Sequence, residues 1–195
     1  MKWVVTGIIG VTILLLGIFV LIFNSQQKAN PHSSTHPDST LSDMVGKPAP
    51  DFTLQTYDDK TYSLNGLRGK KVVLFFSEGI MCYPACWNQI AALGSDTNLN
   101  NDKIVTLSIV PDSKKEWLEA AERMPELGKE AILLDTDKAV SDKYNMLNQP
   151  SSMHRGMMPG HTYIIIDENG VVRYTLDDPK MSIQNQGLLQ EISAL

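Results

Sequence analysis

Residues 71–90 place both cysteines of the 195-residue chain at the passage from a buried strand into a helix. Residues 72–76 form a continuous apolar run, which is typical of a strand covered on both faces. Pro84 suits a first helical turn, because the amide proton that it lacks would be unpaired there. Cys86 then falls in that turn, where free N–H groups and the helix dipole favour a thiolate. Cys82, four residues earlier, is close enough to form a disulfide with Cys86 if it lies at or just before the helix start. The sequence therefore predicts a redox or soft-metal site at the end of a strand.

Residues 3–23 are almost all apolar and carry no charge. About 20 such residues are enough for one membrane crossing, whereas the apolar core of a signal peptide usually has only about 7–15. We therefore predict that residues 1–23 are an uncleaved, single-pass transmembrane anchor. A short positive amino end, here with Lys2, usually stays in the cytoplasm. The globular part is then expected on the extracytoplasmic side of the membrane, where disulfides persist.

Residues 24–43 are polar, contain two prolines and have no apolar period, which predicts a flexible linker. Residues 44–195 have the size of one domain that can bury its own core. The net charge is −5 and no basic run is present, so the sequence gives no support for a nucleic-acid partner. It leaves the oligomeric state open.

Strand and helix patterns alternate along the predicted domain, which indicates an α/β fold. In the helix expected over 111–123, Asp112 or Ser113 is the cap, and Trp117, Leu118 and Ala121 face inward. Glu168 to Gly170 has the composition of a hairpin turn between the last two strands. The order, with a cysteine pair opening the helix after an early strand, is that of a thioredoxin-like fold: a mixed central sheet flanked by helices. Strands are expected near 52–55, 72–76, 104–110, 131–135, 163–167 and 171–176, with a turn and a further strand within 57–64, and helices near 87–93, 111–123, 137–145 and 183–195.

Four segments carry a family pattern: 45–54, 69–76, 134–144 and 164–170. Together they resemble the redoxin branch of the thioredoxin superfamily, which holds the alkyl hydroperoxide reductase and thiol-specific antioxidant proteins, the peroxiredoxins and their membrane-tethered thiol–disulfide relatives. The resemblance covers residues 45–175. It implies an oxidoreductase, without a cofactor, that acts on a hydroperoxide or on another protein's disulfide.

The site differs from each subfamily. Peroxiredoxins have a proline seven residues, and a threonine or serine three residues, before the peroxidatic cysteine; with Cys86 matched to that cysteine, these positions hold Gly79 and Tyr83. Dithiol oxidoreductases of the superfamily have two residues between their cysteines, and this chain has three. The family's cis-proline and the peroxiredoxin arginine both map to His161, and Pro159 is a candidate shifted substitute for the proline.

Three residues between the cysteines and a histidine ahead of a late strand are also similar to the Sco-type copper proteins. That resemblance implies copper bound by Cys82, Cys86 and His161 in a non-enzymatic metallochaperone. The preceding loop, 153–161, is rich in methionine and histidine, with His154 among them, and thioether and imidazole are acceptable copper ligands.

Several alternatives stay open at this stage. The leading hypothesis is a membrane-anchored, extracytoplasmic thiol–disulfide oxidoreductase or peroxiredoxin-like protein with Cys82, Cys86 and His161 in its catalytic site. Cys82, nearer the loop, is expected to be the more exposed and to attack in dithiol exchange, whereas the peroxiredoxin match makes Cys86 the attacker. Glu78 is expected to be a surface carboxylate, and Trp87 a core residue. The other hypotheses are copper binding, a purely structural disulfide and a redox-inert partner-binding domain.

Overall fold

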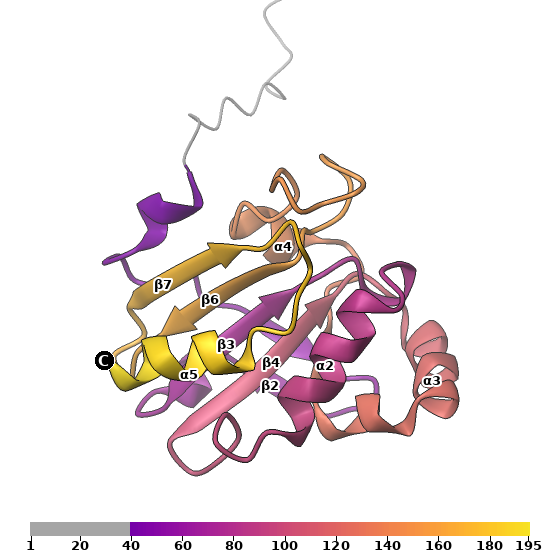
Figure 1. Ribbon diagram of the computed structural model, residues 1–195, viewed down its shortest axis with the longest axis horizontal. Helices are drawn as coiled ribbons and strands as arrows, with labels where there is room; N and C mark the ends of the chain where they lie inside the picture. The colour runs from indigo at the N-terminus through magenta and orange to yellow at the C-terminus, as the bar shows by residue number, and fades with distance from the viewer. Residues whose placement is uncertain (1–39) are drawn as a thin grey trace, which may run out of the picture. The chain divides into compact units, whose positions relative to one another are not determined.

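The computed structural model describes residues 40–195, which are built around one five-stranded sheet with the strand order β5-β4-β3-β6-β7 (Figure 1). A separate two-stranded sheet pairs β1 with β2. The strands are β1 (Thr53–Gln55), β2 (Thr61–Ser63), β3 (Lys71–Phe76), β4 (Ile104–Val110), β5 (Ala131–Leu134), β6 (Thr162–Ile166) and β7 (Val172–Asp177). The α-helices are α2 (Ala85–Ser95), α3 (Lys114–Arg123), α4 (Ala139–Lys143) and α5 (Asn185–Ser193). Short 3-10 helices are η1 (Leu41–Met44), η2 (Asn65–Leu67), η3 (Gly79–Met81) and η4 (Pro125–Lys129).

The large sheet mixes parallel and antiparallel pairing, as predicted. β3, at its centre, runs parallel to β4 and antiparallel to β6, and β4 runs parallel to β5. β6 and β7 form the expected antiparallel hairpin. In the β3–β6 register Phe76 faces Thr162, so the end of β3 and the start of β6 lie at the same edge of the sheet. Side chains that follow β3 and precede β6 are thereby brought together.

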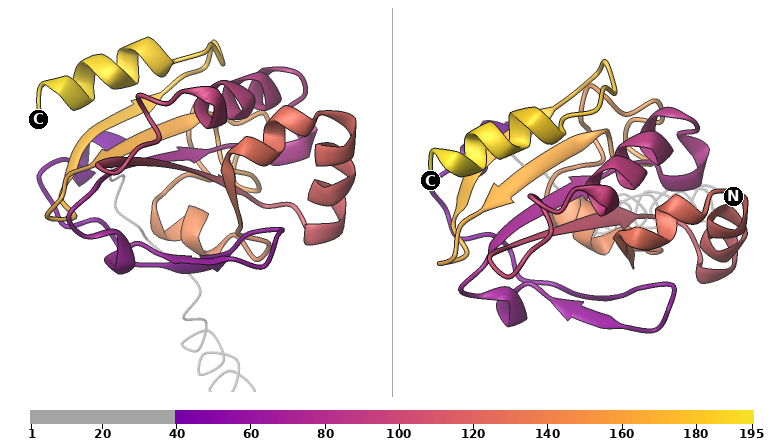
Figure 2. Two further views of the ribbon diagram at one scale, coloured as in Figure 1. Left: turned by 90° about the horizontal axis from the view of Figure 1, so that it is seen from below. Right: turned by 60° about the horizontal axis from the view of Figure 1, so that its bottom comes forward.

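Alternate side chains of β3 pack into two separate cores, because successive residues of a strand point to opposite faces. Val73 and Phe75 pack among residues from α2, α3 and α5. Val72, Leu74 and Phe76 pack with residues from α4 and from the segments flanking the β1–β2 pair. The two layers are visible on opposite sides of the sheet in Figure 2. Burial on both faces explains why this strand is apolar throughout.

The α3 helix begins at the predicted cap, but the face that it buries differs from the predicted one. The Ser113 side chain and the Glu116 backbone and carboxylate form a capping box. Trp117 and Ala120, three residues apart, are buried against the core. The prediction that Leu118 points inward is wrong, since 43% of its surface is exposed. The neighbour of an inward residue on a helix is turned about 100° away from it, and only i+3 and i+4 stay on the same face.

The predicted anchor and most of the predicted linker lie outside the described residues. Within 40–195, no helix combines the length and the apolar composition that a bilayer crossing needs. The described part begins with η1, whose Leu41 and Met44 pack against the core on the α4 side of the sheet.

Glu130, between η4 and β5, should make folding stability fall as the pH rises. It is buried, it accepts a hydrogen bond from Thr106 Oγ1 at 2.9 Å, and its burial raises the pKa of the carboxyl to about 8 from an ordinary value of 4.5. Between these pKa values the folded state keeps a proton that the unfolded chain loses. The contribution of the neutral carboxyl is therefore complete below pH 4.5 and is lost as the pH rises through 8.

Between pH 5 and pH 8, we expect this carboxyl to lower the free energy of unfolding of the wild type by about 1–3 kcal/mol. Glu130→Gln has no titrating carboxyl at this position and should not show this decrease. Urea denaturation of wild type and variant across this range measures it. Glu122→Gln, on the exposed side of α3, is the control and should keep the wild-type pH dependence. Identical pH dependence for wild type and Glu130→Gln would contradict the assignment.

Candidate active site

A disulfide joins Cys82 and Cys86 just beyond the end of β3. Cys82 follows η3, and Cys86 is the second residue of α2. The two sulfurs are bonded at 2.02 Å, and the Cα atoms are 5.3 Å apart. The backbone N–H of Cys86 donates to the carbonyl of Cys82 at 2.9 Å, so Cys82 stands one turn ahead of Cys86. The structure thus has the predicted pairing at the predicted helix start.

His161 lies against this disulfide. It immediately precedes β6, and the antiparallel β3–β6 register brings it to the edge where the cysteines stand. Its Nδ1 is 3.4 Å from Cys86 Sγ, its Nε2 is 2.8 Å from the hydroxyl oxygen of Tyr163, and its ring packs edge-on to Phe75. Desolvation by burial lowers the pKa of His161 to about 4, against the opposing effect of Asp178. The imidazole is therefore neutral near pH 7 and can accept a proton.

Both cysteines are buried, so the prediction that Cys82 is the exposed one is wrong. Only 3% of Cys82 and 1% of Cys86 are accessible. The residues on either side of Cys82 are nevertheless open to solvent: Met81 is 52% exposed and Tyr83 is 70% exposed. The difference arises because a segment far away in the sequence covers Cys82: Met181 Sδ lies 3.9 Å from its Sγ. Cys82 is thus buried beneath the Met181 side chain, although it lies between two solvent-exposed residues.

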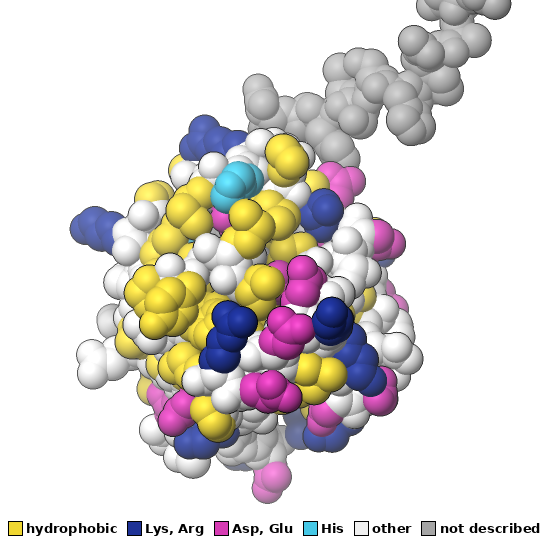
Figure 3. Space-filling view, turned by 90° about the vertical axis from the view of Figure 1, so that its right-hand side faces the viewer, with side chains coloured by type: hydrophobic (Ala, Val, Ile, Leu, Met, Phe, Trp, Pro, Cys, Tyr) yellow, Lys and Arg dark blue, Asp and Glu magenta, His cyan; other side chains and the backbone are white. Residues whose placement is uncertain are grey.

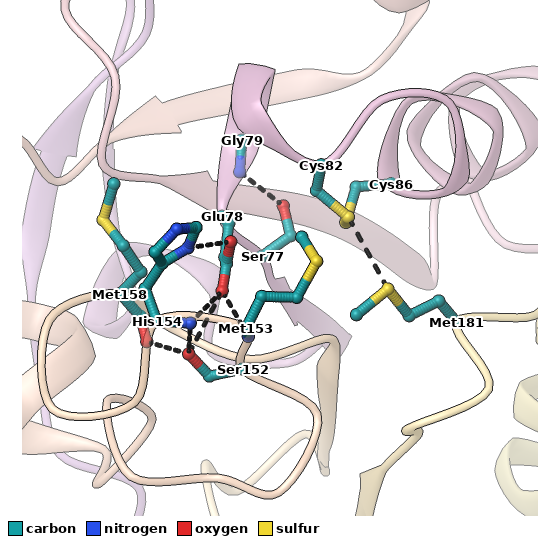
Figure 4. A network of polar contacts seen from close by, with 10 residues as sticks. All are labelled: Ser77, Glu78, Gly79, Cys82, Cys86, Ser152, Met153, His154, Met158 and Met181. Carbon is teal, nitrogen blue, oxygen red and sulfur yellow. Dashed lines mark hydrogen bonds and ion pairs between the residues drawn. A yellow bond between two sulfur atoms is a disulfide. The ribbon is translucent and has the colours of Figure 1, made fainter.

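The Glu78 carboxylate is buried as well, in contrast to the predicted surface position. Its Oε1 accepts hydrogen bonds from the backbone N–H groups of Met153 at 2.6 Å and His154 at 3.0 Å, and from Ser152 Oγ at 3.1 Å. Its Oε2 is 2.8 Å from His154 Nδ1 (Figure 4). A carboxylate with these donors stays satisfied away from water. Glu78 thus ties the loop after β3 to the loop that leads to His161.

The loop of residues 153–158 holds the remaining predicted candidates. His154 is engaged with Glu78, and Met153, Arg155 and Met157 are exposed. Among the His, Cys, Asp and Glu side chains of residues 40–195, one group is close enough to hold a metal ion: Cys82, Cys86 and His161, whose ligand atoms lie within 4.8 Å of one another. Pro159 is not a cis-proline, because within the described residues the cis bond is Tyr83–Pro84.

Asp112 shapes the turn before Cys82, instead of capping α3. Its Oδ2 accepts from the N–H of Ile80 at 3.0 Å, and burial raises the pKa of its carboxyl to about 7. Gly79 has a φ of +62°, and a Cβ there would overlap the Asp112 carboxylate. This position therefore requires glycine, which explains why it lacks the proline that the peroxiredoxin match places there.

Hydrophobic side chains gather between charged groups on the side of the domain shown in Figure 3. A pocket of ≈ 480 Å³ opens next to the disulfide loop and is lined by Ile80, Tyr83, Trp87, Arg123 and Met124. Trp87 is buried against the core, as predicted. An apolar surface beside a buried disulfide suits contact with a partner or an organic substrate.

Sequence reasoning missed two neighbours of the site. Tyr163 could have been found, because it is two residues from His161, and residues two apart in an extended segment point to the same side. Met181 had no sequence signal, since 99 residues separate it from Cys82.

A thioredoxin-like sheet with a buried disulfide and an imidazole at the end of its central strand defines a thiol oxidoreductase. The AhpC/TSA family model matches residues 45–175. A Haemophilus influenzae protein named "Putative peroxiredoxin bcp" is 29% identical over 153 residues, covering 77% of this chain and 97% of that protein. A Coxiella burnetii protein of the same name is 30% identical over 152 residues, covering 68% and 87%. The crystal structure of reduced Plasmodium vivax 2-Cys peroxiredoxin has the same fold, with a TM-score of 0.65 and 24% identity, covering 77% of this chain and 81% of that chain.

The chain belongs to the AhpC/TSA family. The predicted class, an oxidoreductase of the thiol–disulfide exchange or peroxidase type with a thioredoxin-like fold, is confirmed.

Proposed function

We propose that Cys82 and Cys86 alternate between dithiol and disulfide and carry two electrons to a hydroperoxide. The observation that carries this proposal is the buried contact of 3.4 Å between Cys86 Sγ and His161 Nδ1. A purely structural disulfide gains nothing from a neutral base beside one sulfur, and a four-residue separation closes almost no loop. The peroxiredoxin names of the relatives support a hydroperoxide as the oxidising substrate.

In the proposed cycle Cys82 attacks first, because it borders the exposed Met81 and Tyr83. The Cys82 thiolate attacks the outer oxygen of the hydroperoxide, the O–O bond breaks, and the product alcohol takes up a proton. Cys82 is left as a sulfenic acid. The Cys86 thiol then gives its proton to His161 Nδ1 and attacks the Cys82 sulfur, which releases water and forms the disulfide. A dithiol reductant restores both thiols.

The same cycle run on a sulfur substrate is thiol–disulfide exchange with another protein. Thiol–disulfide exchange is supported by two departures of the site from the peroxiredoxin pattern. Tyr83 stands where the peroxiredoxin match requires a small hydroxyl, and His161 stands in place of the arginine. In this reaction, Cys82 attacks the partner's disulfide, and Cys86 then attacks the resulting mixed disulfide and releases the reduced partner.

Two measurements on the full chain test the proposal. The reduced protein should lose two thiols and consume one equivalent of cumene hydroperoxide or, in a parallel arm, one equivalent of oxidised glutathione. The faster arm identifies the substrate class. A reduction potential below about −300 mV, together with no turnover in either arm, would show an inert structural disulfide and refute the proposal.

Copper binding by Cys82, Cys86 and His161 is a second candidate function, favoured by their ligand atoms lying within 4.8 Å of one another. Two thiolates and an imidazole suit Cu(I), which the reduced site would bind as cargo. The test is titration of the reduced full chain with Cu(I) against a competing chelator. Weak binding, or binding unchanged by His161→Ala, rejects this candidate.

We also propose that residues 1–23 anchor the protein in the membrane and that residues 44–195 lie outside the cytoplasm, with 24–43 as the linker. The uncharged apolar run at 3–23 supports this. Intact cells treated with a reductant and a membrane-impermeant maleimide should show labelled Cys82 or Cys86. Labelling only after lysis would reject this orientation.

A further inference from the structure

The turn formed by residues 178–184 contacts both halves of the candidate site. The backbone N–H of Asp178 donates to the carbonyl of His161 at 2.9 Å. The thioether sulfur of Met181 lies 3.9 Å from Cys82 Sγ and, in Figure 4, points at the disulfide from the side opposite the Glu78 network. One turn thus holds the backbone of the histidine and covers a cysteine.

Met181 is held in place by an unusual backbone. Its φ is +50°, which is uncommon for a residue other than glycine and implies that the surroundings enforce it. The Asp178 carboxylate supplies that constraint by accepting hydrogen bonds from the N–H groups of Lys180 at 3.0 Å and Ser182 at 2.9 Å, and from the Gln184 side chain at 2.7 Å. The conformation places the Met181 side chain over Cys82.

The turn is also bonded to α2, which carries Cys86. Gln184 N–H donates to Gln89 Oε1 at 2.8 Å, and Gln89 Nε2 donates to Asn185 Oδ1 at 3.0 Å. The backbone of the turn is therefore fixed at both ends, at Asp178 by the bond to His161 and at Gln184 by the bond to Gln89. The Met181 side chain between them has three rotatable bonds and can move while this backbone stays in place.

We propose that Met181 limits access to Cys82: its thioether shields the sulfur, and only a substrate that displaces this side chain reaches it. This inference rests on the proposed function, in which Cys82 attacks first. Met181 is then a specificity-determining residue. It accounts for a nucleophile that is 3% exposed although Met81 and Tyr83 beside it are open to solvent.

The test is the rate at which dithiothreitol reduces the disulfide of the oxidised full chain, followed by acid quench and thiol alkylation. Met181→Ala should raise this rate about tenfold, because access of the attacking thiol sets the rate. Met181→Leu, which refills the space, should stay within about twofold of wild type. Met181→Gly removes the side chain and suits the positive φ, so it should fold and also react faster. The matched control is Ile183→Ala in the same turn, which is 60% exposed and should react like wild type.

If Met181 acts only by shielding Cys82, its removal speeds the reduction and the reoxidation of the disulfide equally. The reduction potential of Met181→Ala should therefore equal that of wild type. An unchanged rate in both the alanine and glycine variants overturns the proposal, and so does an equal acceleration in Ile183→Ala. A rate gain matched by a shift in potential also overturns it, because the contact would then act on disulfide stability. Reduction by dithiothreitol requires no turnover, so this result is readable even if neither hydroperoxide nor glutathione disulfide proves to be a substrate.

Discussion

Cys86→Ser is expected to abolish turnover, with a loss of about a thousandfold or more, and to trap Cys82 in a mixed disulfide. Without the second thiol, the bond between Cys82 and a sulfur substrate has no internal attacker. The neutral His161 next to residue 86 then has no thiol to deprotonate. After incubation of the reduced variant with oxidised glutathione, mass spectrometry should show one stable glutathione adduct at Cys82.

Cys82→Ser is the matched control for this experiment. It should be equally inactive but should form little adduct, because Cys86 is buried next to the buried Trp87, whereas Cys82 borders the exposed Met81 and Tyr83. The reversed pattern, with an adduct on Cys86 and none on Cys82, would make Cys86 the attacking thiol, as the peroxiredoxin match predicts. Full activity in both variants would show that the pair is redox-inert.

His161→Gln should slow the step in which Cys86 attacks by about a hundredfold, while the first attack by Cys82 stays near the wild-type rate. The imidazole Nδ1 lies next to the Cys86 sulfur, so it acts on the second step. Stopped-flow mixing of the reduced chain with oxidised glutathione separates the two steps as mixed-disulfide formation, which releases the first glutathione, and closure of the Cys82–Cys86 disulfide, which releases the second. Equal slowing of both steps, or of neither, would contradict this role.

The pH dependence and a second variant sharpen the His161 test. Burial lowers the pKa of His161 to about 4, so the base form is present at neutral pH and is lost as the pH falls through 4. The second step should therefore persist in mild acid. Tyr163→Phe removes the hydroxyl that contacts Nε2 and leaves the ring in place, so it should slow the second step by less than about tenfold.

Local sequence patterns predicted the elements well where the signal is short-range. The apolar run of β3, the Ser113 cap of α3 and the turn between β6 and β7 all lie where the sequence placed them. The meeting of His161 with the cysteines was also predictable, through the family pattern and the order of the strands. In each case the cause lies within a few residues or in the connection of neighbouring strands.

Burial of individual polar and sulfur groups was not predictable in this way. Glu78 reads as a loop carboxylate, yet three backbone or side-chain donors and an imidazole from residues 152–154 enclose it. Leu118 reads as core, yet it points outward. The burial of Glu78 depends on which distant segment packs against it, and a sequence pattern carries no such information, whereas the outward position of Leu118 follows from the helical spacing of the buried Trp117 and Ala120.

The sequence by itself determined the α/β order, the two cysteines at a helix start and the class of chemistry that they permit, because periodicity, capping and thiol reactivity are local properties. Only the tertiary structure decided that His161 touches Cys86 and not Cys82, that Asp112 demands glycine at position 79, and that Met181 covers Cys82 from 99 residues away. These contacts arise where the carboxyl ends of β3, β4 and β7 and the amino end of β6 lie at one edge of the sheet. Pairing between strands that are distant in the sequence determines which side chains are neighbours there.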